Sequence, residues 1–159
     1  MTYLIRNFDA QRDHEAALSF IMGSQAYEAQ VEPNRRLDPS VATDFLPLLM
    51  QEVAQKRGLV LVAESDGHAV GWAVMTEEDL PIFVTLTERH YCYIGELFVA
   101  EKMRGHGIGR ALMAACEEEA RARGIGQIMI GVLTASERTH EIYKRAGYAP
   151  YASELRKYL

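Results

Sequence analysis

The sequence predicts a mixed α/β fold of 159 residues, with an antiparallel front half and a strand–helix–strand unit behind it. Two observations support this prediction. Apolar residues recur at helical spacing in four segments, which alternate with strand-like runs. The dipeptide Asp66–Gly67 also lies between two apolar runs, a strong signal for a β-hairpin. The expected order of elements is β-α-α-β-β-β-α-β-α-β, and residues 1–159 are expected to form one domain.

The N-terminal half is expected to contain one strand, two helices and the two hairpin strands. A loop with two prolines separates the helices, and Gly58 ends the second helix. Residues 76–89 show no clear pattern and are expected to form a loop. In chain order, the expected elements cover residues 2–8, 9–30, 40–56, 59–65 and 68–75.

The C-terminal half is expected to alternate strands and helices. Gly124 and Gly147 end its two helices. The strand at residues 127–134 shows little apolar alternation, which indicates burial on both faces. In chain order, the elements are expected at residues 90–100, 108–123, 127–134, 135–146 and, as a last strand, 148–159.

Composition argues against several classes of protein and partner. The net charge of −5 disfavours bulk binding to nucleic acid or to an anionic membrane. No apolar run approaches the length of a membrane span, and the N-terminus lacks the apolar core of a secretory signal. Cys92 and Cys116 fall on separate elements and are expected to be reduced core thiols of a cytoplasmic protein.

Three glycines at alternate positions join a strand to a helix: Gly105, Gly107 and Gly109. The first N–H groups of a helix are unpaired, and the helix dipole adds positive charge there. Glycines remove β-carbons and permit positive φ, so successive N–H groups can converge on a phosphate. The stretch lacks both the Gly-Lys-Ser/Thr ending of a nucleotide P-loop and the spacing G-x-G-x-x-G. A tight turn without a ligand is the alternative interpretation.

The stretch Arg104 to Gly109, RGHGIG, matches the R/Q-x-x-G-x-G/A signature of the GCN5-related N-acetyltransferase (GNAT) superfamily. Around it, ELFVAEKMRGHGIGRALM resembles that superfamily's fourth strand, pyrophosphate loop and third helix. Further on, SERTHEIYKRAGYAPY is similar to the family's pattern of Asn, Ala, Tyr, Lys and Gly-Phe. Ser136 stands in place of the Asn and Thr139 in place of the Ala. The resemblance is specific from about Tyr93 to Tyr151 and implies the GNAT acyl-CoA N-acyltransferase fold.

The resemblance implies acetyl-CoA as the co-substrate and no metal. The backbone N–H groups of the glycine loop would hold the CoA pyrophosphate, and the backbone of residues 97–99 would pair with the pantetheine arm. By the same resemblance, Val99 would polarise the thioester oxygen. Ser136 would either contact the cofactor or only begin the last helix, because Thr134 to Glu137 also form a capping-box pattern. The cofactor-binding residues implied are Leu97, Phe98, Val99, Arg104, Gly105, His106, Gly107, Ile108, Gly109, Arg110, Ser136 and Tyr143.

Acetyl transfer to an amine poses two proton problems. An alkyl ammonium, with a pKa of about 10, must lose a proton before attack, and a thiolate, whose thiol has a pKa of about 8.5, must leave. Tyr143 matches the family tyrosine that faces the CoA sulfur and is assigned as general acid, with core packing on its helical stripe as the alternative. Glu96 is the candidate base, acting through a water, or else a binding site for a cationic amine. His90 and His140 are weaker candidates.

The function implied is acetyl transfer from acetyl-CoA to a primary amine of a small molecule or of a protein N-terminus. The alternatives are a non-catalytic acyl-CoA sensor on the same fold and a phosphate-binding module unrelated to CoA. The matched motifs all touch the cofactor, so they leave open both the acceptor and the oligomeric state, including a homodimer. The acceptor pocket is expected from the first two helices, their loop and the segment before the fourth strand. Its polar candidates are Tyr27, Glu28, Glu32, Arg35, Arg36, Asp38, Tyr91 and Tyr93.

Overall fold

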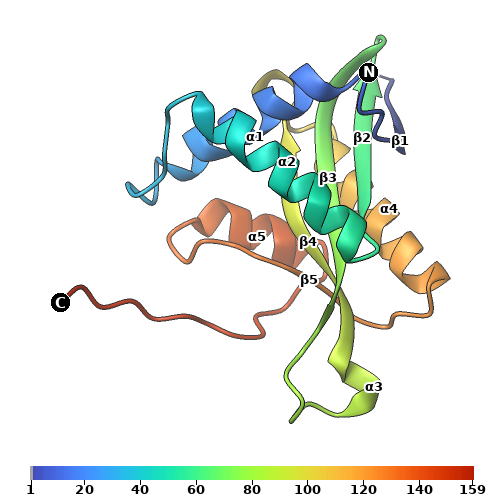
Figure 1. The fold of residues 1–159 in the computed structure, drawn as a ribbon, viewed down its shortest axis with the longest axis vertical. Coiled ribbons are helices and arrows are strands. Elements are labelled where there is room, and N and C mark those ends of the chain that lie inside the picture. The colour runs from blue at the N-terminus through green and yellow to red at the C-terminus, as the bar shows by residue number, and fades with distance from the viewer. Residues whose placement is uncertain (1) are drawn as a thin grey trace.

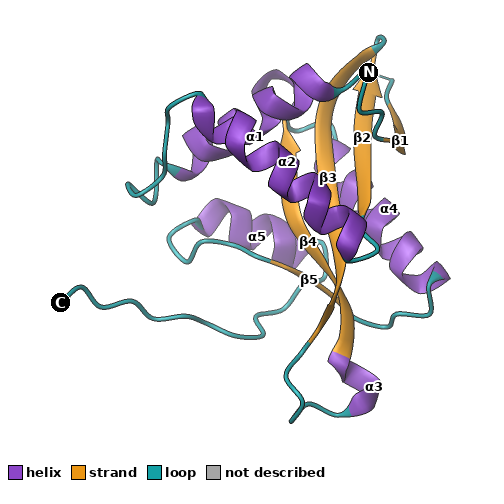
Figure 2. Ribbon diagram, in the orientation of Figure 1, coloured by secondary structure: helices purple, strands orange, loops and turns teal. Residues whose placement is uncertain are grey.

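The computed structural model describes residues 2–159 and contains one five-stranded sheet in the order β1-β2-β3-β4-β5. Helices cover both faces of this sheet, as Figures 1 and 2 show. The fold class predicted from the sequence is therefore confirmed. The elements are β1 (Leu4–Asn7), α1 (His14–Glu28), α2 (Ser40–Gln55), β2 (Leu59–Ser65), β3 (His68–Asp79), α3 (Leu86–Arg89), β4 (His90–Val99), a 3-10 turn η1 (Glu101–Met103), α4 (Ile108–Ala122), β5 (Ile128–Ile130) and α5 (Glu137–Arg145).

The first four strands pair antiparallel in chain order, and the fifth pairs parallel to the fourth. Asp66 and Gly67 both have positive φ, 49° and 78°, as a tight two-residue hairpin turn requires. The predicted β2–β3 hairpin is thus confirmed. Gly124 and Gly147 also have positive φ and follow α4 and α5, where the sequence predicts that these helices end.

Alternate side chains of the strands enter two separate cores. On one face, Val62 and Trp72 are fully buried against α1 and α2. On the other face, Ala63, Ala73 and Cys92 are fully buried against α4. Since both faces are covered, the central strands are apolar at successive positions rather than at every second one.

The sheet opens between β4 and β5. These two strands pair only at Cys92–Ile94 with Ile128–Ile130, whereas β4 continues to Val99 and pairs with β3 on both sides of a bulge at Gly95. Within residues 2–159, the segment Glu96–Val99 therefore has a strand partner on one edge alone. This opening positions the site described below.

The last predicted strand, at residues 148–159, is not formed. The segment is extended, carries no secondary structure and is exposed from Ala149 onward, leading away from the body of the molecule in Figure 1. Pro150 interrupts it and lacks the N–H that a sheet ladder needs. Its polar anchor is an ion pair of 2.8 Å between Arg156 and Glu32 in the α1–α2 loop.

Two other strand boundaries differ from the prediction. β5 covers three residues instead of 127–134, and all three are half-buried. The prediction that this strand is buried on both faces was wrong, because β5 lies at the edge of the sheet and has one neighbouring strand. β3 runs on to Asp79, and α3 follows, where a loop was expected at 76–89. The added part of β3 pairs with the start of β4, from Asp79 opposite His90 to Glu77 opposite Cys92.

Cys92 and Cys116 are free and fully buried, so the expectation of reduced core thiols is confirmed. Burial raises the pKa of both thiols, which keeps them protonated. None of the helices in residues 2–159 combines the length and apolar character that a membrane crossing requires.

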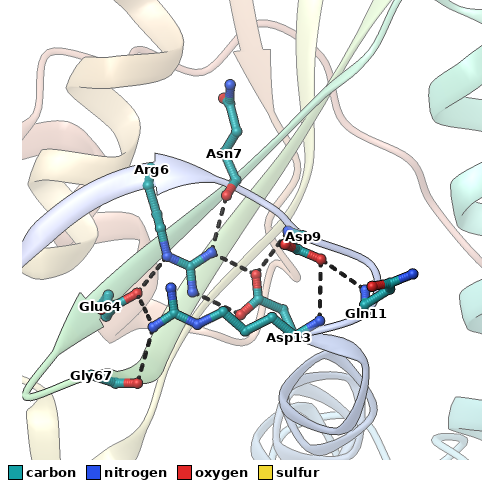
Figure 3. Close-up of polar contacts among 8 residues, drawn as sticks. Arg6, Asn7, Asp9, Gln11, Asp13, Glu64 and Gly67 are labelled. Carbon is teal, nitrogen blue, oxygen red and sulfur yellow. Dashed lines mark hydrogen bonds and ion pairs between the residues drawn. The ribbon is translucent and has the colours of Figure 1, made fainter.

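A half-buried arginine joins the N-terminal strand to α1 and β2 (Figure 3). Arg6 donates two hydrogen bonds to the Asp13 carboxylate, at 2.6 and 2.7 Å, and a third to Glu64. Asp13 is only 2% exposed and also accepts the backbone N–H of Asp9 at 2.9 Å. The hydrogen bonds from Arg6 hold the pKa of Asp13 below its usual value of 3.8.

Replacing Asp13 with Ala should lower the free energy of unfolding by about 3 kcal/mol at pH 7, because it removes the buried carboxylate that binds the half-buried Arg6 guanidinium. Urea denaturation measures this change. The control is Asp44→Ala: Asp44 is exposed and lies 4.0 Å from Arg36, so its loss should change stability by less than about 0.5 kcal/mol. An equal loss of unfolding free energy in the two variants would contradict a stabilising role of the Arg6–Asp13 pair.

The same pair should have a defined pH dependence. The folded-state pKa of Asp13 is lowered, so its contribution is complete above 3.8 and is lost as the pH falls through the lower folded value. The stability difference between the wild type and Asp13→Ala should therefore be constant above about pH 5 and shrink below about pH 4. A difference that stayed constant down to pH 3 would show that the Asp13 charge is not its source.

Candidate active site

A cavity of about 230 Å³ lies at the opening between β4 and β5. It is walled by α1, the α1–α2 loop, the two diverging strands and α5. The lining residues are Ser24, Gln25, Glu28, Arg35, Ile94, Gly95, Glu96, Leu97, Ile130, Gly131 and Tyr143. The cavity thus brings Glu96 and Tyr143, the two catalytic candidates of the sequence analysis, onto one surface.

Glu96 lies in β4, opposite Val74 of β3. Strand alternation places it on the same side as Phe98, which packs in the core formed with α1 and α2. Burial, and secondly the negative charge of Glu28, raise the pKa of the Glu96 carboxyl to about 7. The carboxyl is therefore close to half-ionised at neutral pH, which is suited to a group that accepts and releases a proton.

Tyr143 reaches the cavity from α5. Its ring packs against the core beside α4, with its centroid 6.1 Å from that of Tyr148. Burial, followed by the negative charge of Glu28, raises the pKa of the Tyr143 hydroxyl well above its usual value. The hydroxyl consequently stays protonated and is available as a hydrogen-bond donor. Tyr143 therefore both packs against the core and lines the cavity.

α1 contributes three polar residues, Ser24, Gln25 and Glu28, to the cavity wall. Gly23 permits this, because a β-carbon at that position would lie only 2.4 Å from the Phe98 ring. Ser24 and Gln25 were not among the expected site residues. Their spacing of four and three residues before Glu28 places all three on one helix face, which is the signal that would have found them.

An ion pair also faces the cavity. The Arg35 Nε atom in the α1–α2 loop donates to Glu28 Oε2 at 2.6 Å. Of the polar residues expected for the acceptor pocket, Glu28 and Arg35 are the two that line this cavity. Tyr93 lies next to it, since its hydroxyl would be 2.5 Å from a β-carbon on Gly131.

The other expected acceptor residues have different contacts. Glu32 pairs with Arg156, and Arg36 pairs with Asp38 at 2.9 Å on the exposed part of the loop. Tyr27 lies within 3.2 Å of the Thr139 hydroxyl. Tyr91 lies at the start of β4 and, with these residues, is absent from the cavity lining.

The glycine loop has the backbone conformation that its sequence predicts. Gly105 and Gly107 have φ of 82° and 81°, where other residues are strained. A β-carbon on Gly105 would meet nothing within 4 Å, so the loop backbone there is open. Gly107 is the N-cap of α4, whose first N–H groups begin at this point. Gly109 lies inside the helix and has no positive φ.

Basic side chains lie close to the start of α4. Arg110 of α4 and Arg145 of α5 line a second cavity of about 170 Å³ together with Met113. Arg104 precedes the loop and donates from Nε to the Val99 carbonyl at 3.0 Å. An open glycine backbone, a helix N-terminus and nearby guanidinium groups suit a phosphate-bearing ligand.

Ser136 is buried and lies at the N-cap position of α5, but its side chain makes no capping hydrogen bond. The capping box expected at Thr134–Glu137 is therefore not formed. The Ser136 hydroxyl instead donates to Thr139 Oγ1 at 2.8 Å, which continues the contact to Tyr27. The Arg104 guanidinium covers the Tyr27 ring at 5.1 Å, so this chain of contacts connects α5, α1 and the segment after β4.

None of the histidine candidates lines the main cavity. His90 contacts Glu77 and Asp79 at the far end of β4, at 3.2 and 3.1 Å. His106 is exposed beside the Met103 carbonyl. His140 has a buried Nε2 atom without a hydrogen-bond partner among residues 2–159. Over the same residues, no group of three or more His, Cys, Asp or Glu side chains is arranged to hold a metal ion.

Comparison with known proteins agrees with this arrangement. The model of the acetyltransferase (GNAT) family matches residues 23–148, most of the chain, so the chain belongs to this family. Membership indicates acetyl transfer that uses acetyl-CoA. The chain is also 32% identical to the acetyltransferase Atu2258 of Agrobacterium fabrum over 127 residues, which cover 79% of this chain and 82% of that protein.

Solved structures show the same fold. A tetramutant of the BH1408 protein from Bacillus halodurans superposes with a TM-score of 0.81 at 22% identity, over 98% of this chain and 99% of that one. A predicted acetyltransferase with acetyl-CoA from Clostridium acetobutylicum superposes with a TM-score of 0.72 at 21% identity, over 99% of this chain and 96% of that one. At this level of identity the likeness concerns the fold.

The raised pKa of Glu96 should be visible in protein stability. A carboxyl whose folded pKa exceeds its ordinary value of 4.5 favours the folded state below 4.5 and loses that effect as the pH rises through about 7. Between pH 5 and pH 8, the wild type should therefore lose about 1–3 kcal/mol of unfolding free energy relative to Glu96→Gln. Urea denaturation at each pH measures the difference.

The matched control is Glu118→Gln on the exposed surface of α4, which should follow the wild-type profile. Parallel profiles for the wild type and Glu96→Gln would mean that Glu96 ionises at its ordinary pKa and that the cavity does not perturb it.

Proposed function

We propose that residues 1–159 act as one catalytic domain, an acetyl-CoA-dependent N-acetyltransferase whose acceptor is a primary amine. The observation that carries the proposal is the shared cavity of Glu96 and Tyr143. One group has a pKa of about 7 and the other is held protonated, so the cavity offers both a proton acceptor and a hydrogen-bond donor.

Glu96 serves as the base. An ordinary glutamate has a pKa near 4.5 and is a weak base toward an ammonium with a pKa of about 10. Burial beside Glu28 raises the pKa of Glu96 and so reduces the difference between its pKa and that of the ammonium. Part of the carboxyl is still ionised at neutral pH. Glu96 therefore accepts the ammonium proton, directly or through a water, more readily than an exposed carboxylate would.

Tyr143 serves on the leaving-group side. Acetyl-CoA supplies the acetyl thioester that the amine attacks. As the carbon–nitrogen bond forms and the carbon–sulfur bond breaks, the sulfur leaves as a thiolate, and the second proton lost by the amine nitrogen converts it to a thiol with an ordinary pKa near 8.5. Because burial and the negative charge of Glu28 raise the pKa of Tyr143, complete proton transfer from it to the thiolate is unfavourable. Tyr143 then acts mainly by donating a hydrogen bond to the developing negative charge, which is present only in the transition state.

The cofactor is proposed to lie along the unpaired edge of β4 and on the glycine loop. The edge Leu97–Val99 presents backbone groups to an extended arm, as a neighbouring strand would. The open loop from Arg104 to Arg110 offers backbone N–H groups to the pyrophosphate. Ser136, buried and connected to Thr139, is proposed to border this path.

Acetyl-CoA should raise the melting temperature of the protein, and Gly107→Ala should remove most of that effect. Ligand at 100 times its dissociation constant adds about 2.7 kcal/mol of stability. A side chain at Gly107 strains the left-handed backbone that presents the N–H groups. The control is Gly124→Ala, which strains a left-handed backbone of the same kind after the other end of α4, outside the loop. A wild-type acetyl-CoA affinity of Gly107→Ala by calorimetry would exclude the loop.

Turnover is tested by following release of the CoA thiol with a panel of primary amines. With an accepted amine, Tyr143→Phe should lower kcat by at least about tenfold and leave the acetyl-CoA dissociation constant unchanged within about twofold. The substitution keeps the ring that packs on Tyr148 and removes only the hydroxyl. A non-catalytic sensor on this fold would bind acetyl-CoA and release no thiol with any amine.

Two results would remove Tyr143 from catalysis. One is a wild-type kcat for Tyr143→Phe when product release does not limit the rate. The other is a loss of melting temperature with kcat unchanged, which indicates a packing role alone.

A further inference from the structure

The Glu28–Arg35 ion pair differs from its neighbours because both partners line the cavity that holds Glu96 and Tyr143. The two side chains are 35% and 27% exposed, so they are neither sealed in a core nor fully hydrated. Within residues 2–159, Arg35 donates to Glu28 from Nε and to Asn34 from Nη1, and Nη2 makes no hydrogen bond. The pair therefore has unused hydrogen-bonding capacity beside the cavity.

The adjacent arginine provides an internal comparison. Arg36 pairs with Asp38 at 2.9 Å, both side chains are more than half exposed, and neither lines the cavity. An exposed pair of this kind serves the loop surface and contributes little to stability. The contrast indicates that the position of Arg35, rather than the basic character of the loop, is the feature related to the site.

The cavity wall therefore carries charges of both signs. Glu28 and the partly ionised Glu96 are the acidic groups, and Arg35 is the basic one. A cationic group of a ligand would be stabilised near the two acids. An anionic group of the ligand would be stabilised near Arg35, because a planar guanidinium binds a carboxylate through two parallel hydrogen bonds. A ligand with one charge of each sign satisfies all three groups without adding net charge to a partly buried site.

The size of the cavity limits the ligand. About 230 Å³ corresponds to the volume of roughly eight water molecules. Such a space suits a compact molecule whose two charges lie a few atoms apart. A polyamine would bring two or more positive charges to a wall that already contains Arg35.

We propose that the acceptor is a small amino acid, with its carboxylate bound by Arg35 and its ammonium placed between Glu28 and Glu96. Arg35 is then a specificity-determining residue, and Glu28 holds Arg35 in place on the cavity wall. The inference rests on the proposed acetyltransferase function and adds the substrate class. The ammonium lies next to Glu96, the group that accepts its proton, so recognition of the carboxylate directs the amine to the base.

The test uses matched acceptors that differ only in the carboxylate. Each set contains an amino acid, its amide and its decarboxylated amine: for example alanine, alanine amide and ethylamine, with corresponding sets for serine and valine. Thiol release from acetyl-CoA gives kcat and KM. The amino acids should exceed both partners by at least about tenfold in kcat/KM, mainly through KM. The amide also represents a peptide N-terminus, which has no carboxylate beside its amine.

Arg35→Met removes the charge and keeps a side chain of similar length. It should raise KM for the amino acid at least about tenfold and change KM for the decarboxylated amine less than twofold, so the preference disappears. Arg35→Lys should restore part of the preference. Arg36→Met is the matched control and should behave as the wild type. Melting temperature and acetyl-CoA affinity show whether each variant is folded.

Calorimetric titration of the amino acids into the CoA-bound protein gives a second readout that needs no turnover. Binding that is lost in Arg35→Met but retained in Arg36→Met supports the inference even if no acetylated product forms, in which case the proposed function fails alone. A preference of the wild type for the amide or the decarboxylated amine overturns the inference while the transferase function stands. Equal effects of Arg35→Met on all three acceptors overturn it as well.

Discussion

The separation of β4 from β5 is the constraint on which the site depends. The two strands pair at only three positions, and β4 then continues beside β3 alone. Backbone groups on the free edge need partners, and a cavity lies at the same point with walls from two helices and a loop. Interruption of an otherwise continuous sheet therefore produces both a free strand edge and a cavity beside it.

The ionisable groups in the opening between β4 and β5 affect one another's pKa values. Glu28 raises the pKa of both Glu96 and Tyr143, after burial itself, because negative charges in a poorly hydrated space disfavour further ionisation. Arg35 balances Glu28 on the same wall. Arrival of a cationic amine would reverse part of this effect, since a positive charge favours ionised Glu96. The protonation of the site and the occupancy of the site are thus linked.

Two different kinds of packing hold the walls in position. At one end, Arg6 connects β1, the start of α1 and β2 through partly buried hydrogen bonds. At the other end, the absence of a side chain at Gly23 lets α1 approach Phe98, so that the last turns of α1 reach the cavity. An added β-carbon there would push α1 away from β4 and move Glu28 with it. The position of Glu28 in the cavity wall therefore depends on the backbone packing of α1.

Local sequence determined the hairpin at Asp66–Gly67, the ends of α4 and α5 and the open conformation of the glycine loop, because each depends on φ preferences of a few adjacent residues. Together with the family motif, it also identified Glu96 and Tyr143, which lie on one cavity. Tertiary structure alone decided the shortness of β5 and the meeting of Glu28 and Arg35 with Glu96. These features depend on contacts between segments far apart in the chain, whose pairing and burial no local pattern specifies.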